Sequence, residues 1–293
     1  MSHVLEMRGV DKRYGTRPVL HGVDLHVARG EVLGFVGPNG AGKSTCLRIL
    51  LGLTRRDGGA VQVHGLDPAW DSLAIRRRTA YLPGETSLYL HMRGSAFLEF
   101  ALRFYAAVDL PLRRRLEELF GLPLHRRIRT YSAGMKQKLA LLATLVPEVE
   151  LYLLDEPDRA LDATARLQLR DVLRELQRAG RTIVLSSHHL SEVEALADRL
   201  LFLHEGRVVD DARVRAVRDA LRHEIRLRLE AGTPLPDGHE QVREEPDGAL
   251  RVSVPGNPYA WLARIDPRRI RSAEVGDTRL EEIYKGLTEV RAP

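Results

Sequence analysis

The sequence has little cysteine, few aromatic residues and no long apolar run. Its 293 residues contain a single cysteine, Cys46, so no disulfide can form within the chain, as is usual in a reducing compartment. The longest apolar run, near 139–146, is far too short to cross a bilayer. The first residues lack a charged segment followed by an apolar one, so we expect no signal peptide and a cytosolic protein.

A strong excess of charge of one sign is also lacking. The 45 Lys and Arg residues against 40 Asp and Glu residues give a net charge of +5. The basic residues are spread along the chain and interleaved with acids, as in 113–118, which is typical of solvated helix surface. Because aromatic residues make up only 5% and do not alternate with basic ones, we expect no nucleic-acid binding.

A glycine-rich loop follows a short apolar segment at 32–36, which predicts a buried strand. Residues 37–45 match the phosphate-loop pattern G-x-x-x-x-G-K-[ST] in full. Its glycines let backbone N–H groups surround phosphates, and the helix after it offers a positive end. Lys43 would neutralise the phosphates, Ser44 would ligate Mg²⁺ and Thr45 would bond an α-phosphate oxygen. The candidate nucleotide-binding residues of this loop are Gly37, Asn39, Gly40, Gly42, Lys43, Ser44 and Thr45.

Two further apolar strands end in polar residues. After residues 151–154 come Asp155 and Glu156, placed where open α/β sheets hold ligands. Asp155 is expected to hold Mg²⁺, and Glu156 to accept a proton from, or orient, the attacking water. After residues 182–185 comes a pair of histidines, of which His188, preferred to His189, could donate to the γ-phosphate. These features predict a phosphate-loop ATPase or GTPase.

Residues 131–138, Tyr-Ser-Ala-Gly-Met-Lys-Gln-Lys, resemble the signature motif of ATP-binding cassette (ABC) proteins. The variant is similar to that of exporters whose membrane subunits are of the ABC-2 type. The resemblance implies that Ser132 and Gly134 contact the γ-phosphate of ATP held by a second copy in a head-to-tail dimer. It also implies permease subunits of the ABC-2 type as partners, and a cytoplasmic location, peripheral on the inner face of the membrane.

The resemblance extends over about 4–215 and places Tyr14 against adenine, the alternative being a core tyrosine. The chain departs from the family at three places, one of them small, Ala133 for the usual glycine of the signature. The other two are loops. Gly84 stands where most cassettes have the glutamine of the Q loop (81–85), so either Glu85 replaces it or the Mg²⁺ ligand is absent and coupling relies on backbone motion. In the D loop (158–162), Arg159 and Ala160 replace Ser and Gly. We expect hydrolysis to survive both changes.

The expected fold is α/β, a phosphate-loop cassette with a mixed β-sheet core at 1–215 and a helical subdomain at about 86–145. The resemblance implies a groove between this subdomain and the Q loop that receives a short helix of the membrane partner. Leu88, Tyr89, Leu90 and Met92 are candidates for its floor, the alternative being that they pack inside the subdomain. Alternation at 225–229 and 250–254 predicts antiparallel strands within a small C-terminal α+β domain, 216–293, which ends in a helix near 279–284. That domain shows no catalytic constellation, so dimerisation or regulation is its expected role.

We therefore predict an ATP-binding and ATP-hydrolysing subunit of an ABC exporter, which works as a dimer beneath separate membrane subunits. The alternative is a soluble ABC ATPase acting on ribosomes or nucleic acid. Such proteins usually carry two cassettes in one chain or a long coiled-coil insertion, and this sequence has neither.

Overall fold

The computed structural model describes residues 3–187, 193, 196–209, 222–256 and 258–276. The chain divides into two compact units, the larger ending at Val208, and each is described by itself. The sequence-based boundary at 215/216 falls within 210–221, outside the described residues, and stays a prediction. The predicted helix near 279–284 also lies outside them.

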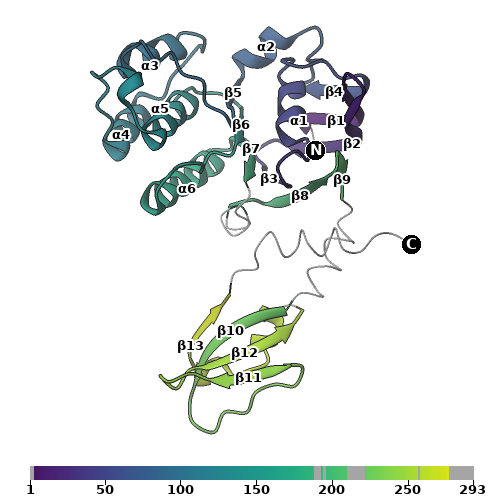
Figure 1. The fold of residues 1–293 in the computed structure, drawn as a ribbon, viewed down its shortest axis with the longest axis vertical. Coiled ribbons are helices and arrows are strands. Elements are labelled where there is room, and N and C mark those ends of the chain that lie inside the picture. Colours follow the sequence, from purple (N-terminus) through teal and green to yellow (C-terminus); the bar gives the residue numbers. More distant parts are fainter. Residues whose placement is uncertain (1–2, 188–192, 194–195, 210–221, 257, 277–293) are drawn as a thin grey trace. The chain divides into compact units, whose positions relative to one another are not determined.

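The larger unit contains two sheets (Figure 1). A three-stranded antiparallel sheet has the order β2-β1-β4, formed by β1 (His3–Tyr14), β2 (Arg17–Ala28) and β4 (Gly58–Val63). A six-stranded sheet has the order β5-β6-β7-β3-β8-β9, and it is parallel apart from β9. Its strands are β3 (Val32–Val36), β5 (Thr79–Leu82), β6 (Leu151–Asp155), β7 (Thr182–Ser187), β8 (Arg199–His204) and β9 (Arg207–Val208).

The central strands of the six-stranded sheet are apolar because both of their faces are covered. Every residue of β3 and of β6 is buried. Such continuous burial is typical of parallel strands with helices on both sides, and it explains why these segments could be recognised as short apolar runs. The strands predicted at 32–36, 151–154 and 182–185 are all present. The strand β7 lies between β6, which ends in the acid pair, and β3, which precedes the phosphate loop. The acid pair and the phosphate loop are therefore separated by one strand.

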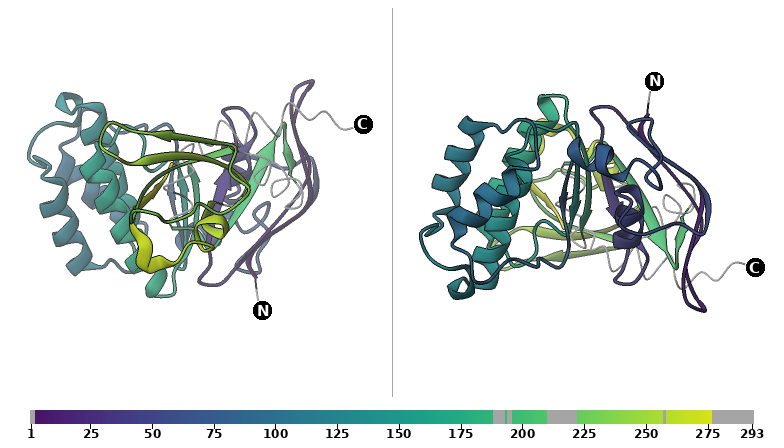
Figure 2. Two further views of the ribbon diagram at one scale, coloured as in Figure 1. Left: turned by 90° about the horizontal axis from the view of Figure 1, so that it is seen from below. Right: turned by 90° about the horizontal axis from the view of Figure 1, so that it is seen from above.

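Helices cover the two sides of the strands β5, β6 and β7. The helix α1 lies on one side and a layer containing α3, α4 and α5 lies on the other (Figures 1 and 2). The helix α4 begins at Asp109, whose side chain accepts from the Leu112 amide at 2.8 Å, and ends at Gly121 in the left-handed region. The helical segments of this unit are α1 (Lys43–Leu50), α2 (Ser72–Arg77), α3 (Gly94–Leu102), α4 (Leu110–Phe120), η1 (Ile128–Thr130), α5 (Ala133–Leu145) and α6 (Ala163–Arg178).

The smaller unit is a four-stranded antiparallel sheet with the order β11-β12-β10-β13. Alternation places Ile225, Leu227, Val252 and Val254 on one buried face, where they pack with Trp261. The Trp261 indole donates to the Asp237 carbonyl at 3.1 Å. The elements of this unit are β10 (Arg222–Leu229), β11 (Gln241–Glu244), β12 (Leu250–Pro255), α9 (Pro258–Leu262), η2 (Pro267–Arg269) and β13 (Ile270–Val275).

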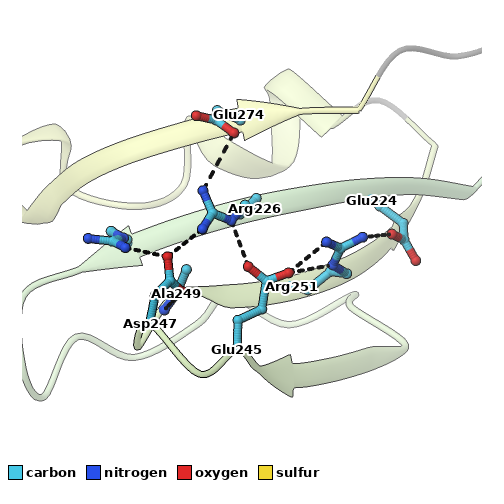
Figure 3. Close-up of polar contacts among 8 residues, drawn as sticks. Glu224, Arg226, Glu245, Asp247, Ala249, Arg251 and Glu274 are labelled. Atoms are coloured by element: carbon cyan, nitrogen blue, oxygen red, sulfur yellow. Dashed lines mark hydrogen bonds and ion pairs between the residues drawn. The ribbon is translucent and has the colours of Figure 1, made fainter.

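The other face of this sheet carries a network of ion pairs (Figure 3). Arg226 donates to Glu245 at 2.6 Å and also pairs with Asp247, while Arg251 bonds Glu245 at 2.6 Å and Glu224 at 3.0 Å. These side chains are partly exposed, so each pair contributes little to stability. The network keeps one face of the sheet polar, while the opposite face forms the core of the unit.

The α/β cassette with a mixed sheet, and the additional small α+β unit, agree with the predicted fold class, which is confirmed. Within the residues that the structure describes, no helix combines the length and the apolar character needed to cross a bilayer.

Candidate functional site

The phosphate loop is shaped by its glycines. Gly40 and Gly42 have φ angles of 83° and 110°, which favour glycine. Gly37 is required for a different reason, since a Cβ atom there would lie 2.4 Å from the carbonyl oxygen of Leu203. No side chain caps the start of α1 at Gly42, so the amides of its first turn are available to an anion. The loop can therefore bind phosphate groups through its backbone.

Lys43 is buried at the start of α1. Its Nζ donates to the carbonyl oxygens of Gly37 at 2.5 Å and Pro38 at 3.0 Å. Burial lowers the pKa of Lys43, and the carboxylates of Glu156 and Asp155 partly offset that effect. The predicted cation and the two predicted acids thus act on one another, although more than one hundred residues separate them in the sequence.

The other predicted residues of the loop are distributed between its tip and its base. Asn39 and Gly40 are exposed at the tip, Ser44 is half-buried and Thr45 is buried in the first turn of α1. Cys46 is fully buried, and burial raises the pKa of its thiol to about 12. Cys46 is therefore a small apolar core residue and not a reactive thiol.

Asp155 and Glu156 stand at the carboxyl end of β6. Asp155 is buried and accepts a hydrogen bond of 2.6 Å from the hydroxyl of Ser186. Glu156 has a φ angle of 52°, and its amide donates to the carbonyl and the hydroxyl oxygens of Ser186, both at 3.1 Å. Ser186 was not predicted as a site residue. Its position was readable as the end of a strand, but its pairing with Asp155 depends on β6 and β7 being neighbours.

The donor set fits a magnesium ion. The Ser44 hydroxyl and the Asp155 carboxylate are hard oxygen ligands of the kind that Mg²⁺ prefers. The Ser186 hydroxyl donates a hydrogen bond to Oδ1 of Asp155, and this bond orients the carboxylate. When bound, the ion would neutralise charge on the β- and γ-phosphates.

Position 84 of the Q loop faces the same carboxylate. A Cβ atom on Gly84 would lie 3.2 Å from Oδ2 of Asp155, so a side chain here would point directly at the candidate metal ligand. Glycine has no side chain, so position 84 supplies no ligand atom in this direction. Glu85, the alternative, is exposed and lines a separate pocket of about 330 Å³ with Lys136 and Arg159.

The signature motif forms the start of α5. The exposed Ser132 caps this helix, and its hydroxyl accepts from the Met135 amide at 3.2 Å. A Cβ atom on Gly134 would lie 2.9 Å from the Ala160 carbonyl oxygen, so glycine allows the helix to approach the D loop closely. Gln137, buried one turn further on, donates to the Pro157 carbonyl at 3.1 Å.

The start of α5 does not join the phosphate loop of its own chain. The helices α1 and α5 lie on opposite sides of β5, β6 and β7 (Figures 1 and 2). The 330 Å³ pocket beside Ala133 is lined by the Q loop, the D loop and α5, and no residue of 37–45, all of them described, contributes to it. The two halves of the predicted nucleotide site are therefore separate within one chain.

Tyr14 and His188 complete the predicted site residues. Tyr14 ends β1 with 47% of its surface exposed, which excludes the core alternative, and the Lys12 ammonium lies 5.3 Å from its ring centroid. The ring is thus accessible to a planar ligand. His188 lies outside the described residues, so its role stays a prediction.

Lys43 is buried in the phosphate loop after β3, and an acid pair stands at the carboxyl end of β6 in the same parallel sheet. This arrangement defines a phosphate-loop nucleoside triphosphatase. A family model described as ABC transporter matches residues 20–159. The chain is 33% identical to the daunorubicin/doxorubicin resistance ATP-binding protein DrrA of Streptomyces peucetius, covering 98% of this chain and 93% of that protein. It is 38% identical to the daunorubicin resistance ATP-binding protein DrrA3 of Streptomyces coeruleorubidus, over 94% and 84%.

A solved ATP-binding subunit of an ABC transporter is similar in structure, with a TM-score of 0.65 and 32% identity over 73% of this chain and 92% of that one. The chain belongs to the ABC transporter family. The prediction of an ABC-type ATPase, made from the signature at 131–138, is confirmed.

Proposed function

We propose that this chain is the ATP-hydrolysing subunit of an exporter, and that it works with Mg²⁺ as a pair of cassettes beneath separate membrane subunits. The observation that carries the proposal is the arrangement of the site. Lys43 is buried in the glycine-shaped loop after β3, and Asp155 and Glu156 stand at the carboxyl end of β6, one strand away across β7. Drug-resistance relatives that match nearly the whole chain support export.

The residues of the site divide the work of phosphoryl transfer. Lys43 leaves its two carbonyl partners to bind the phosphates of ATP, together with the amides at the start of α1. Glu156 accepts a proton from, or orients, the attacking water, and its position is held by the two bonds to Ser186. Asp155 and Ser44 hold the metal ion, and Tyr14 stacks on the adenine.

The separation of the two halves supports a composite site. Because the start of α5 lies away from the phosphate loop of its own chain, Ser132 and Gly134 serve the ATP of a second copy. The start of α5, which Ser132 caps, carries partial positive charge, which favours a phosphate. Two chains arranged head to tail would complete two sites, with His188 as the candidate donor to the γ-phosphate.

A groove in the larger unit offers a place for the membrane partner. It has a volume of about 910 Å³ and is lined by residues of α2, the Q loop, α3 and α5. Tyr89, Phe100 and Phe104 form a row of edge-to-face rings, with centroids 5.6 and 5.3 Å apart, and all three are exposed. We propose that a short cytoplasmic helix of an ABC-2 type permease occupies this groove, which places the chain on the inner face of the membrane.

The four residues predicted for the groove floor have different places. Leu88 lines the groove, and both Leu88 and Met92 pack against the cluster of Ile128, Tyr131 and Leu139 within the helical layer. Tyr89 and Leu90 are exposed. The aromatic residues of α3, spaced at helical intervals, were not singled out from the sequence because the same spacing is typical of residues packed in a core.

The decisive test is Glu156→Gln, which keeps the size of the side chain and removes the base. Turnover of ATP should fall by about 100-fold or more, the usual contribution of a general base. ATP binding should persist, and light scattering should detect a stable dimer with ATP and Mg²⁺. Glu118→Gln, at an exposed position of α4, is the matched control and should behave as wild type.

Undiminished turnover in Glu156→Gln would contradict the assignment of the base. A protein that stays monomeric with ATP, even when hydrolysis is blocked, would contradict the composite site. Isolation with ribosomes in place of a membrane subunit would favour the soluble alternative.

A further inference from the structure

The two loops that depart from the family pattern touch each other. Arg159 of the D loop donates from Nη1 to the carbonyl oxygen of Gly84 in the Q loop at 2.9 Å. The two residues are 75 positions apart in the sequence. A serine at position 159 would be too short to reach across the same gap, so this contact depends on the replacement found in this chain.

The loop that Arg159 belongs to is held in an unfavourable backbone conformation. Glu156 and Ala160 have φ angles of 52° and 58°, in the left-handed region that non-glycine residues rarely adopt. Such a conformation persists only when surrounding contacts hold it. On the side of α5, Gln137 donates to the Pro157 carbonyl at 3.1 Å, and on the side of the Q loop the contact is the Arg159 bond.

The carbonyl that Arg159 holds belongs to the residue facing the candidate metal ligand. The Cβ direction of Gly84 points to Asp155 Oδ2, 3.2 Å away. Because glycine has no side chain, the Q loop cannot reach that carboxylate with a side-chain atom from this position. The distance between the Q loop and Asp155 therefore depends on the backbone of Gly84, whose carbonyl oxygen Arg159 binds.

We infer that Arg159 is a positioning residue for ATP hydrolysis, which ties the Q loop to the loop carrying Glu156 and replaces the side-chain link that glycine at position 84 removes. The inference rests on the proposed function. It also gives a route for the membrane partner to influence hydrolysis, since the Q loop contributes residues Tyr81, Leu82 and Pro83 to the 910 Å³ groove.

The kinetic test compares Arg159→Ala and Arg159→Lys with wild type. Arg159→Ala should lower kcat by about tenfold, as expected for one hydrogen bond from a charged group. The KM for ATP should change by less than about twofold, because Arg159 does not belong to the phosphate loop. Arg159→Lys, which retains a cationic donor, should recover part of the rate. Arg114→Ala, at an exposed position of α4, is the control and should match wild type.

A second measurement reports the mobility of the Q loop and does not depend on ATP hydrolysis. Glu85, next to Gly84, is exposed and can be replaced by cysteine and labelled with a nitroxide. Cys46 does not compete for the label because it is fully buried and its thiol is protonated. In the labelled protein, Arg159→Ala should increase the mobility of the nitroxide, whereas Arg114→Ala should not.

The outcomes separate this inference from the proposed function. A wild-type protein that hydrolyses ATP, with Arg159→Ala unchanged in both kcat and label mobility, overturns the inference alone. A wild-type protein that does not hydrolyse ATP overturns the proposed function, and the label then still reports whether Arg159 holds the Q loop. Loss of kcat with raised mobility, partly restored by lysine, supports the inference.

Discussion

Gly37→Ala should damage the protein through a single methyl group. The new Cβ would lie 2.4 Å from the Leu203 carbonyl oxygen and 3.3 Å from the Cβ of Ala41. Leu203 belongs to β8, whose backbone is held by hydrogen bonds to both neighbouring strands and cannot easily shift. The loss in the free energy of unfolding should therefore lie at the upper end of the range for overpacking, about 3 kcal/mol. For a domain of this size each kcal/mol lowers Tm by about 2–4 °C, which predicts a fall of about 6–12 °C.

The same change should weaken nucleotide binding, because Gly37 supplies the carbonyl that Lys43 holds at 2.5 Å. Moving this carbonyl displaces the ammonium, and we expect the Kd for ATP to rise by about tenfold, equivalent to one charged hydrogen bond. Calorimetry measures both quantities. A Gly37→Ala protein with the Tm and the ATP affinity of wild type would refute the reasoning.

Gly84→Ala is the matched control for the steric argument. Here the new Cβ would lie 3.2 Å from a side-chain oxygen of Asp155, which can move by a few tenths of an ångström. The same glycine-to-alanine change should therefore lower Tm by no more than about 4 °C, corresponding to about 1 kcal/mol. If the two variants lose equal stability, close approach to backbone does not explain the requirement for Gly37.

Two further predictions concern stability. Burial, the larger effect, and the cation of Arg78 lower the pKa of His64 to about 4. Between about pH 4 and 6.5 the unfolded chain therefore binds more protons than the folded one. The free energy of unfolding should fall as the pH drops through that window. Denaturant titrations should show a weaker pH dependence for His64→Gln, and an equal dependence would contradict the assignment. Trp261→Ala should cost about 3–5 kcal/mol in the smaller unit, so that amide hydrogen exchange in β10 and β12 becomes faster while the affinity for ATP stays unchanged.

The sequence was sufficient for the parts of the site that are local. Lys43 and Ser44 belong to one continuous motif, and Asp155 and Glu156 directly follow a buried strand, so residue type and spacing alone predicted them. The fold class followed from the phosphate loop after a short apolar run and from the resemblance to ABC cassettes. These features could be predicted because they depend on neighbours in the chain, which a sequence displays directly. The fold class is confirmed, whereas the roles of the four site residues stay predictions.

The contacts between distant segments were not predictable in the same way. The Ser186 bond to Asp155 requires the strand order β6-β7, and the Arg159 bond to Gly84 requires two loops to meet. Both departures from the family pattern were visible, but nothing in a single sequence indicated that they compensate for one another. The place of Gln137 beneath the D loop likewise depends on how α5 packs.

The ammonium of Lys43 already has two oxygen partners within its own loop. An arriving polyphosphate must therefore outcompete carbonyl groups, and the measured affinity is the difference between two sets of bonds. The same two bonds hold the ammonium in place when no phosphate is bound, so they stabilise the shape of the loop between successive turnovers.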